Sequence, residues 1–159
     1  MTKRLVETII VTGDVMRINT RFPVAVHILA LLALNQETTT TSELIAKSVN
    51  TNPVVIRRIN AMLKKAKLIT IKAGVGGAYL NLSPQEITLL DVYNAVKSSE
   101  DDLLFDLHCN PSKKCVVGAN IHEALSEPLL AAQKSLEDSL QEYTLFDVAE
   151  KIRKSLTEG

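Results

Sequence analysis

The spacing of hydrophobic positions changes along the chain from a helical period to a strand period and back. Residues 22–34 are apolar almost throughout, which predicts a buried helix. A short helix is expected over residues 41–48, because the preceding Thr40-Thr41-Ser42-Glu43 has the S/T-x-x-E form of a capping box. Asn52-Pro53 is typical of a helix start, and an apolar stripe at helical spacing follows it to about residue 66.

Beyond residue 67 the period becomes two. Residues 68–72 and 78–82 are predicted to form strands, and the glycine-rich segment between them is predicted to be the turn of a β-hairpin. Further helices are expected over residues 88–97 and 116–142, and after Thr144. The long helix carries apolar residues three or four positions apart along most of its length: Ile121, Leu125, Leu129, Ala132, Leu136 and Leu140.

A short helix, a tight turn, a longer helix and a hairpin follow one another in the order of a winged helix-turn-helix. The predicted fold class is therefore mainly α with a small β-hairpin, a winged helix-turn-helix domain followed by a long C-terminal dimerisation helix. Residues 1–15 are expected to be an extension or tag outside the fold, and 16–97 to be the DNA-binding domain. Residues 98–118 would form an effector or sensor loop. Residues 119–159 would form a helical arm whose apolar stripe is too long for so small a domain to cover, which predicts a homodimer.

The net charge of the chain is zero, but its charges are unevenly distributed. Residues 44–85 contain seven basic side chains and no acidic one, whereas residues 86–159 contain seven basic and fourteen acidic side chains. A polyanion would be attracted to the middle of the chain and repelled by its end. The predicted partner is double-stranded DNA.

In a helix-turn-helix, the N-terminal part of the second helix enters the major groove, where side chains reach base edges while nearby Lys and Arg neutralise phosphates. The residues expected to read or line the groove are Asn52, Val54, Val55, Arg57 and Arg58. Those expected to meet phosphate are Lys64, Lys65 and Lys72. Thr41, before the first helix of the motif, and Gly76, in the hairpin turn, complete the predicted DNA surface.

From Met16 to about Leu156 the chain resembles the Rrf2 family of bacterial winged-helix regulators. The resemblance is carried by Met16-Arg17-Ile18-Asn19-Thr20-Arg21-Phe22, Ala25-Val26, Ile45-Ala46, Ala66-Lys67-Leu68-Ile69, Gly74, Gly76-Gly77, Tyr79 and Ile87-Thr88-Leu89-Leu90-Asp91-Val92-Tyr93-Asn94-Ala95-Val96. It implies a dimer joined through the long helix, an operator with two half-sites and, more often than not, repression. It also implies that Thr20 and Arg21 contact phosphate and that Val54 and Arg57 face bases. Ala73 stands where some members carry a minor-groove arginine.

Two cysteines, Cys109 and Cys115, are the candidates for a redox sensor. Members of the family that bind an iron–sulfur cluster use three cysteines about six residues apart, and here the third interval falls on Ile121. The chain is therefore similar to the cluster-free branch, and no cofactor is expected. Lys113 and Lys114 would favour the Cys115 thiolate, although inert packing of these cysteines remains an equal alternative.

Other classes of function fit the sequence less well. No catalytic motif is present, so the chain is not expected to be an enzyme. A metal-responsive regulator using His108, Cys109, Cys115 and His122 stays an alternative, as does a winged-helix protein-interaction module. No stretch is apolar enough for a membrane span and no signal peptide is evident, which predicts a cytoplasmic protein, and a small effector remains open.

Overall fold

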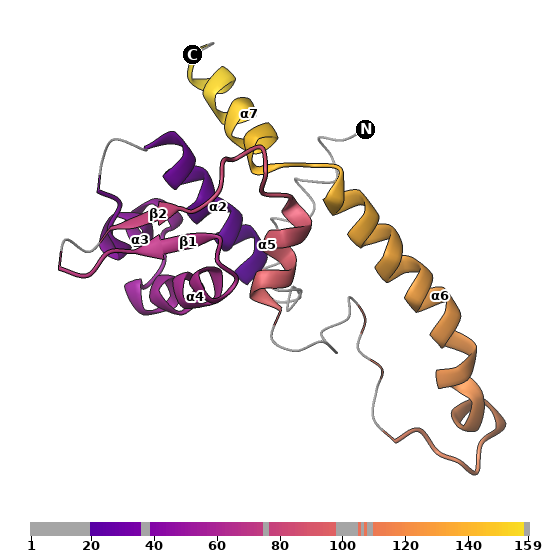
Figure 1. Ribbon diagram of the computed structural model, residues 1–159. Coiled ribbons are helices and arrows are strands. Elements are labelled where there is room, and N and C mark those ends of the chain that lie inside the picture. The colour runs from indigo at the N-terminus through magenta and orange to yellow at the C-terminus, as the bar shows by residue number, and fades with distance from the viewer. Residues whose placement is uncertain are drawn as a thin grey trace.

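The computed structural model describes residues 20–35, 39–74, 77–97, 105, 107 and 110–157. The elements follow in the order α2 (Arg21–Leu34), α3 (Ser42–Val49), α4 (Pro53–Lys65), β1 (Ile69–Ile71), β2 (Ala78–Leu80), α5 (Leu89–Val96), α6 (Val116–Gln141) and α7 (Leu145–Thr157) (Figure 1). The expectation of a mainly helical protein with one small hairpin is confirmed. The predicted extension 1–15 lies outside the described residues, as do residues 98–104, 106, 108 and 109 of the predicted sensor loop.

The core forms where the apolar stripe of α4 meets the helices around it. Ile56, Ile59 and Leu63 are buried to within 2% of complete burial. They belong to one hydrophobic cluster with residues of α2 and α5, such as Ile28 and Val92. Because these positions recur every three or four residues, burying them fixes the rotation of α4 about its own axis. The opposite face of α4 is therefore left to solvent.

The start of α3 differs by one residue from the predicted capping box. The N-cap is Thr41, whose Oγ1 accepts a hydrogen bond from the Leu44 N–H at 3.3 Å. Thr40 is buried instead, and its carbonyl accepts a hydrogen bond from the Ala78 N–H of β2 at 3.2 Å. The pairing of Thr40 with the hairpin moves the helix start one position on, so Glu43 is not the capping partner that its spacing predicted.

The hairpin is short and closely packed. β1 and β2 pair antiparallel with Ile69 opposite Leu80 and Ile71 opposite Ala78, three residues on each strand, where the sequence predicted five. A Cβ added to Gly77 would lie only 2.9 Å from the Thr39 Cγ2, so this glycine permits the close approach of the chain before α3. β1 packs against α4 and β2 against α2, which anchors the hairpin beside the helix-turn-helix.

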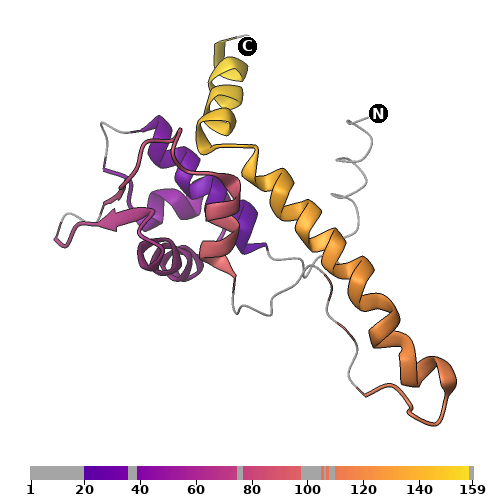
Figure 2. The same ribbon diagram turned by 45° about the vertical axis from the view of Figure 1, so that its right-hand side comes forward.

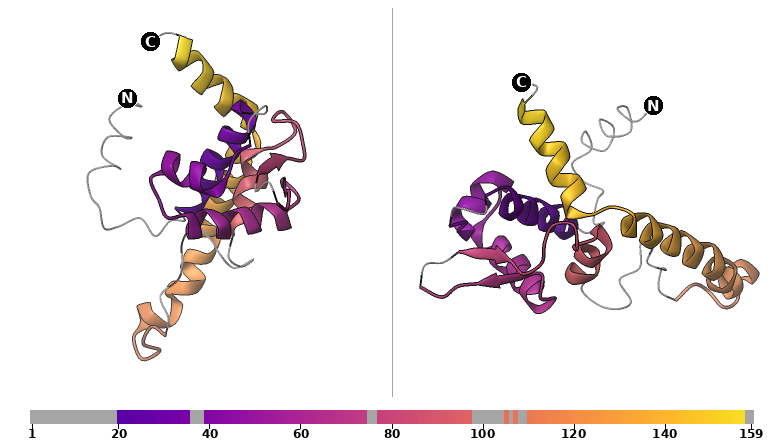
Figure 3. Two further views of the ribbon diagram at one scale, coloured as in Figure 1. Left: turned by 90° about the vertical axis from the view of Figure 1, so that its left-hand side faces the viewer. Right: turned by 45° about the horizontal axis from the view of Figure 1, so that its top comes forward.

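The C-terminal helices leave the domain in two directions (Figures 1 and 2). The C-terminal half of α6 lies beside α5, and its N-terminal half extends away from the rest of the molecule. α7 returns to the domain and packs against α2, with Leu145 and Ala149 buried in the common core (Figure 3). The arm is thus tied to the domain where α6 ends and α7 begins, and it projects at the start of α6.

The starts of α5 and α7 lie side by side and are joined by backbone hydrogen bonds. Thr88 and Thr144 form an isolated antiparallel bridge, and each threonine caps its own helix together with an aspartate three residues later, Asp91 or Asp147. The Leu89 N–H donates to the Tyr143 carbonyl at 2.9 Å across this junction. The two helix starts satisfy one another's free backbone groups as well as their own.

We expect Thr88→Ala to lower the free energy of unfolding by about 1 kcal/mol, because the Asp91 N–H loses its capping acceptor. Urea denaturation at one fixed protein concentration measures the change. Thr157→Ala is the control: this exposed hydroxyl lies in the last turn of α7, and its loss should stay within about 0.5 kcal/mol. Equal losses in the two variants would contradict a stabilising role for the capping box.

Candidate nucleic-acid interface

The outward face of α4 combines cations with exposed apolar side chains. Val54 and Val55, in the first turn, are 49% and 39% exposed, and Arg57 and Arg58 follow them on the surface. A β-branched side chain exposed on a helix gains nothing from packing, but in a major groove it can contact a thymine methyl group. The structure thus presents together the valines and arginines that the sequence singled out.

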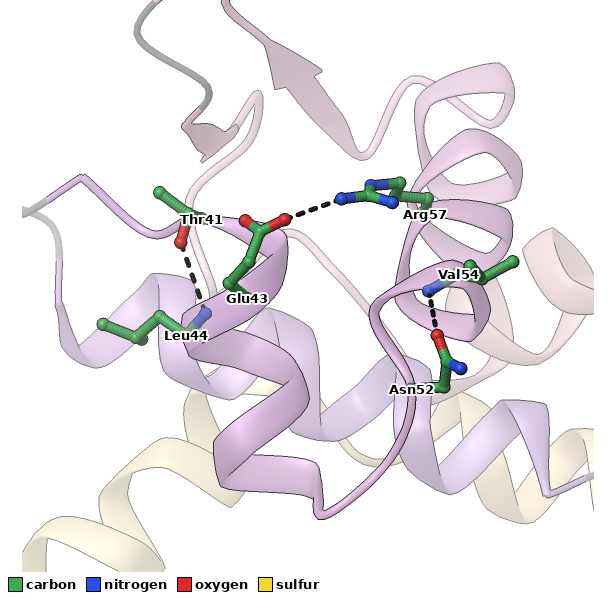
Figure 4. A network of polar contacts seen from close by, with 6 residues as sticks. All are labelled: Thr41, Glu43, Leu44, Asn52, Val54 and Arg57. Atoms are coloured by element: carbon green, nitrogen blue, oxygen red, sulfur yellow. Dashed lines mark hydrogen bonds and ion pairs between the residues drawn. The ribbon is translucent and has the colours of Figure 1, made fainter.

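The polar residues at the two helix starts have local roles. The Asn52 Oδ1 accepts a hydrogen bond from the Val54 N–H at 2.8 Å, which makes Asn52 the N-cap of α4 (Figure 4). Thr41 caps α3 in the same way. In this conformation their side-chain oxygens accept hydrogen bonds from backbone amides, while the amide nitrogen of Asn52 supplies the donors for a base edge.

Arg57 forms an ion pair on this face of the molecule. Its Nη2 lies 2.6 Å from the Oε1 of Glu43, at the start of α3, and both side chains are more than half exposed (Figure 4). The backbone N–H of Glu43 itself and then the Arg57 guanidinium lower the pKa of the Glu43 carboxyl, so this carboxyl is ionised at neutral pH. Sequence reasoning assigned Glu43 only to a capping box and missed this contact.

Further cations lie in the last turn of α4 and on the hairpin. Lys64 and Lys65 are exposed in its last turn, and Lys72 is exposed just beyond β1, with its Nζ 4.6 Å from the centre of the Tyr79 ring. That cation–π contact holds the Lys72 side chain against the hairpin. These placements suit contact with phosphates on either side of a groove entered by α4.

Two of the remaining predicted DNA contacts lie at the start of α2. Thr20 is exposed immediately before α2, and Arg21, the first residue of that helix, is half-buried. Gly76 lies outside the described residues. The roles of all these residues in DNA binding stay predictions.

Of the two sensor candidates, Cys115 is described and Cys109 lies outside the described residues. Cys115 is an exposed free thiol at the N-cap of α6. Its side chain makes no capping hydrogen bond of regular geometry, but the backbone amides of Gly118 and then Val117 lower the pKa of its thiol. The sequence pointed to Lys113 and Lys114 as the cause, whereas in the structure it is the free N–H groups of the helix start.

A short helix and a longer one joined by a tight turn, the second exposing arginines and the whole flanked by a lysine-bearing hairpin, define a winged helix-turn-helix DNA-binding protein. The chain belongs to the Rrf2 family, described as iron-dependent transcriptional regulators, whose sequence profile matches residues 18–151. It is a transcriptional regulator with a DNA-binding fold, from a family that consists of regulators rather than enzymes.

Individual relatives agree with this placement. The chain is 48% identical over 131 residues to YwnA of Bacillus subtilis strain 168, described as an HTH-type transcriptional regulator, covering 82% of this chain and 96% of that one. A crystal structure described as that of a DNA-binding protein is 43% identical, with a TM-score of 0.66 over 81% of this chain and 98% of its own. The oxidized form of Staphylococcus aureus CymR, 20% identical, shares the fold with a TM-score of 0.63 over 85% of this chain and 97% of its own.

The iron in the family description does not fit the residues of this chain. The sequence contains two cysteines, and the position of a third, six residues after Cys115, is taken by Ile121. Within the described ranges no three His, Cys, Asp or Glu side chains are grouped so that they could hold a metal ion.

In the described part of the chain, no helix is both long enough and apolar enough to cross a membrane.

We expect Cys115 to be alkylated by iodoacetamide at a lower pH than an ordinary cysteine. The thiolate is the reacting form, so a lowered pKa moves the rise of the rate with pH to below the usual value of about 8.5. Mass spectrometry of the Cys115 peptide over a pH series measures the rate. The same protein unfolded in urea is the control, and identical profiles in the two states would contradict activation by the helix start.

Proposed function

We propose that the protein binds a two-half-site DNA operator as a homodimer and, in keeping with its family resemblance, represses transcription there. The observation that carries the proposal is the exposed face of α4. Its arginines and lysines lie in a stretch of the chain, residues 44–85, that contains no acidic residue. Through such a surface the protein can neutralise several phosphates and insert the start of α4 into the major groove.

The dimer is supported by the uncovered apolar surface of α6. Ile121, Leu125 and Leu129, on its apolar stripe, remain partly exposed, and the N-terminal half of the helix projects away from the domain (Figure 1). Only Gln133 is fully buried among the residues of α6. An apolar helix face of this length is covered in solution when a second copy packs along it. Two domains joined in this way would present two copies of α4 to one duplex.

Redox tuning is the form of regulation that the described residues support best. Cys115 is exposed and its thiol pKa is lowered, both of which favour reaction with oxidants. It stands at the N-cap of α6, the helix proposed to join the two subunits, so a modified Cys115 would act at the start of that helix. A small effector remains the alternative.

The first test of this function compares Arg57→Ala with Lys64→Ala. Arg57 lies in the first turns of α4, where a guanidinium can reach guanine O6 and N7, so its loss should cost roughly 1–3 kcal/mol on the operator and much less on random DNA. Lys64 lies seven residues later, about two turns along the helix, and should meet phosphate. Its loss should weaken both DNAs alike and lower the salt slope by about one.

Mobility shifts with an operator selected from a randomised library and with a random duplex, at fixed salt, measure these effects. Equal losses on the two DNAs for Arg57→Ala would make Arg57 a backbone contact. If the affinity for both duplexes did not fall as the salt concentration rises, DNA would not be supported as the partner, and a protein-interaction module would be favoured.

The dimer is tested by Leu125→Asp in the projecting half of α6. A carboxylate on its apolar stripe should shift the protein from dimer to monomer at micromolar concentration, because a charge buried in the interface without a partner is strongly unfavourable. Ala124→Asp, one residue earlier on the exposed side of the helix, should leave the dimer intact. Light scattering gives the mass; a monomeric wild type, or an unchanged mass for Leu125→Asp, would refute the assignment.

A further inference from the structure

The carboxylate of Glu43 lies on the surface proposed to meet DNA, within 2.6 Å of the guanidinium of Arg57 (Figure 4). Glu43 belongs to the first turn of α3 and Arg57 to α4, and the two side chains point toward one another across the helix-turn-helix. Both are well exposed, at 60% and 58% of their side-chain surface. A polyanion approaching this face therefore meets an ion pair rather than a free cation.

A carboxylate at this position lowers the affinity for DNA of any sequence. Glu43 is the only acidic residue in the sequence between residues 38 and 85, and the seven cations of that stretch all follow it along the chain. It repels phosphates, and an exposed ion pair adds little to folding stability. The first turn of α3 favours an acidic side chain modestly through its free N–H groups, but this gain does not require the side chain to reach Arg57 on a surface proposed to meet phosphates.

The ion pair has an effect on base recognition instead. A guanidinium carries five N–H donors, so one bond from Nη2 to Glu43 leaves others for a base edge while it restricts a long, flexible side chain. A carboxylate beside it accepts a hydrogen bond from the amino group of cytosine but is repelled by the acceptors of guanine and thymine. Together the two side chains suit a site where guanine and cytosine edges lie side by side.

We propose that Glu43 is a specificity-determining residue: it positions Arg57 for guanine and weakens binding wherever its carboxylate does not find the amino group of a cytosine. This inference rests on the proposed function, since it concerns the same DNA surface. It deepens that function by assigning discrimination to a residue of α3, outside the recognition helix. The Glu43 carboxylate would lower the affinity for DNA of any sequence and raise the preference for one sequence over others.

The test measures the ratio of operator to random-duplex affinity for wild type, Glu43→Gln, Arg57→Ala and the double variant, at one salt concentration. Glu43→Gln keeps the shape of the side chain and removes its charge. We expect it to raise affinity for random DNA about threefold and to lower the ratio about tenfold, within the range of one base contact. In the Arg57→Ala background the same change should lower the ratio less than in wild type, because there is no guanidinium left to position and only the carboxylate's own preference for cytosine is lost.

Glu86→Gln is the matched control. The Glu86 carboxylate is exposed and accepts hydrogen bonds from Ser83 beyond the hairpin, so its loss removes one negative charge without touching α3 or α4. It should leave the affinity ratio unchanged. Selection from a randomised duplex library provides an independent readout: wild type should enrich one base pair that Glu43→Gln no longer prefers, which loss of stability alone would not produce.

The outcomes separate the two proposals. A wild type without salt-sensitive DNA binding overturns the proposed function and the role of Glu43 with it. If wild type binds an operator but Glu43→Gln keeps both its affinity ratio and its base preference, only the role of Glu43 is overturned. If the ratio of operator to random-duplex affinity falls as much in Glu86→Gln as in Glu43→Gln, the effect is one of charge in general, and this would also refute the assignment.

Discussion

Burial of one apolar stripe on α4 determines what the protein can present to DNA. Ile56, Ile59 and Leu63 are almost completely buried, and each contributes roughly 1.5–3 kcal/mol through removal from water. An α-helix turns 100° per residue, so fixing this stripe fixes the direction of every other side chain on the helix. Val54 and Arg58 must then point away from the core, while Arg57 is directed to the flank that faces α3. The binding surface is in this sense a consequence of how the core packs.

Local chemistry in the sequence was enough to predict most elements, and it failed where a distant residue intervened. Asn52-Pro53 and Thr88 with Asp91 mark helix starts by bonds within a few residues, and the structure begins a helix at each. The start of α3 was wrong by one residue because the carbonyl of Thr40 bonds to Ala78, 38 positions later. Such a bond depends on how the hairpin folds back beside α2, and no pattern of nearby residues reports it.

The candidate site shows the same division between local and distant information. Exposure of Arg57 and Arg58 followed from the helical period alone, whereas the ion pair with Glu43 depends on the way α3 and α4 cross. The signal available in the sequence was the position of Glu43 immediately before the acid-free basic stretch, and the capping motif offered a more familiar explanation for it. Asn52 and Thr41 show the opposite case, in which side chains predicted for DNA already cap helices.

A net charge of zero does not prevent this protein from attracting a polyanion, because its charges are separated in space as well as in sequence. In the described part of the chain, α6 and α7 pack mainly against α5 and α2, not against α4. Charges on the projecting arm are screened over about 8 Å at physiological ionic strength, so they weaken the field at α4 only slightly.

The distance between the arm and α4 also limits how the arm can influence DNA binding. α5 packs on both α4 and α6, and its Tyr93 and Lys97 contact Gln133 and Glu137 of the arm. A rearrangement of α6 would therefore reach the recognition helix most directly through α5.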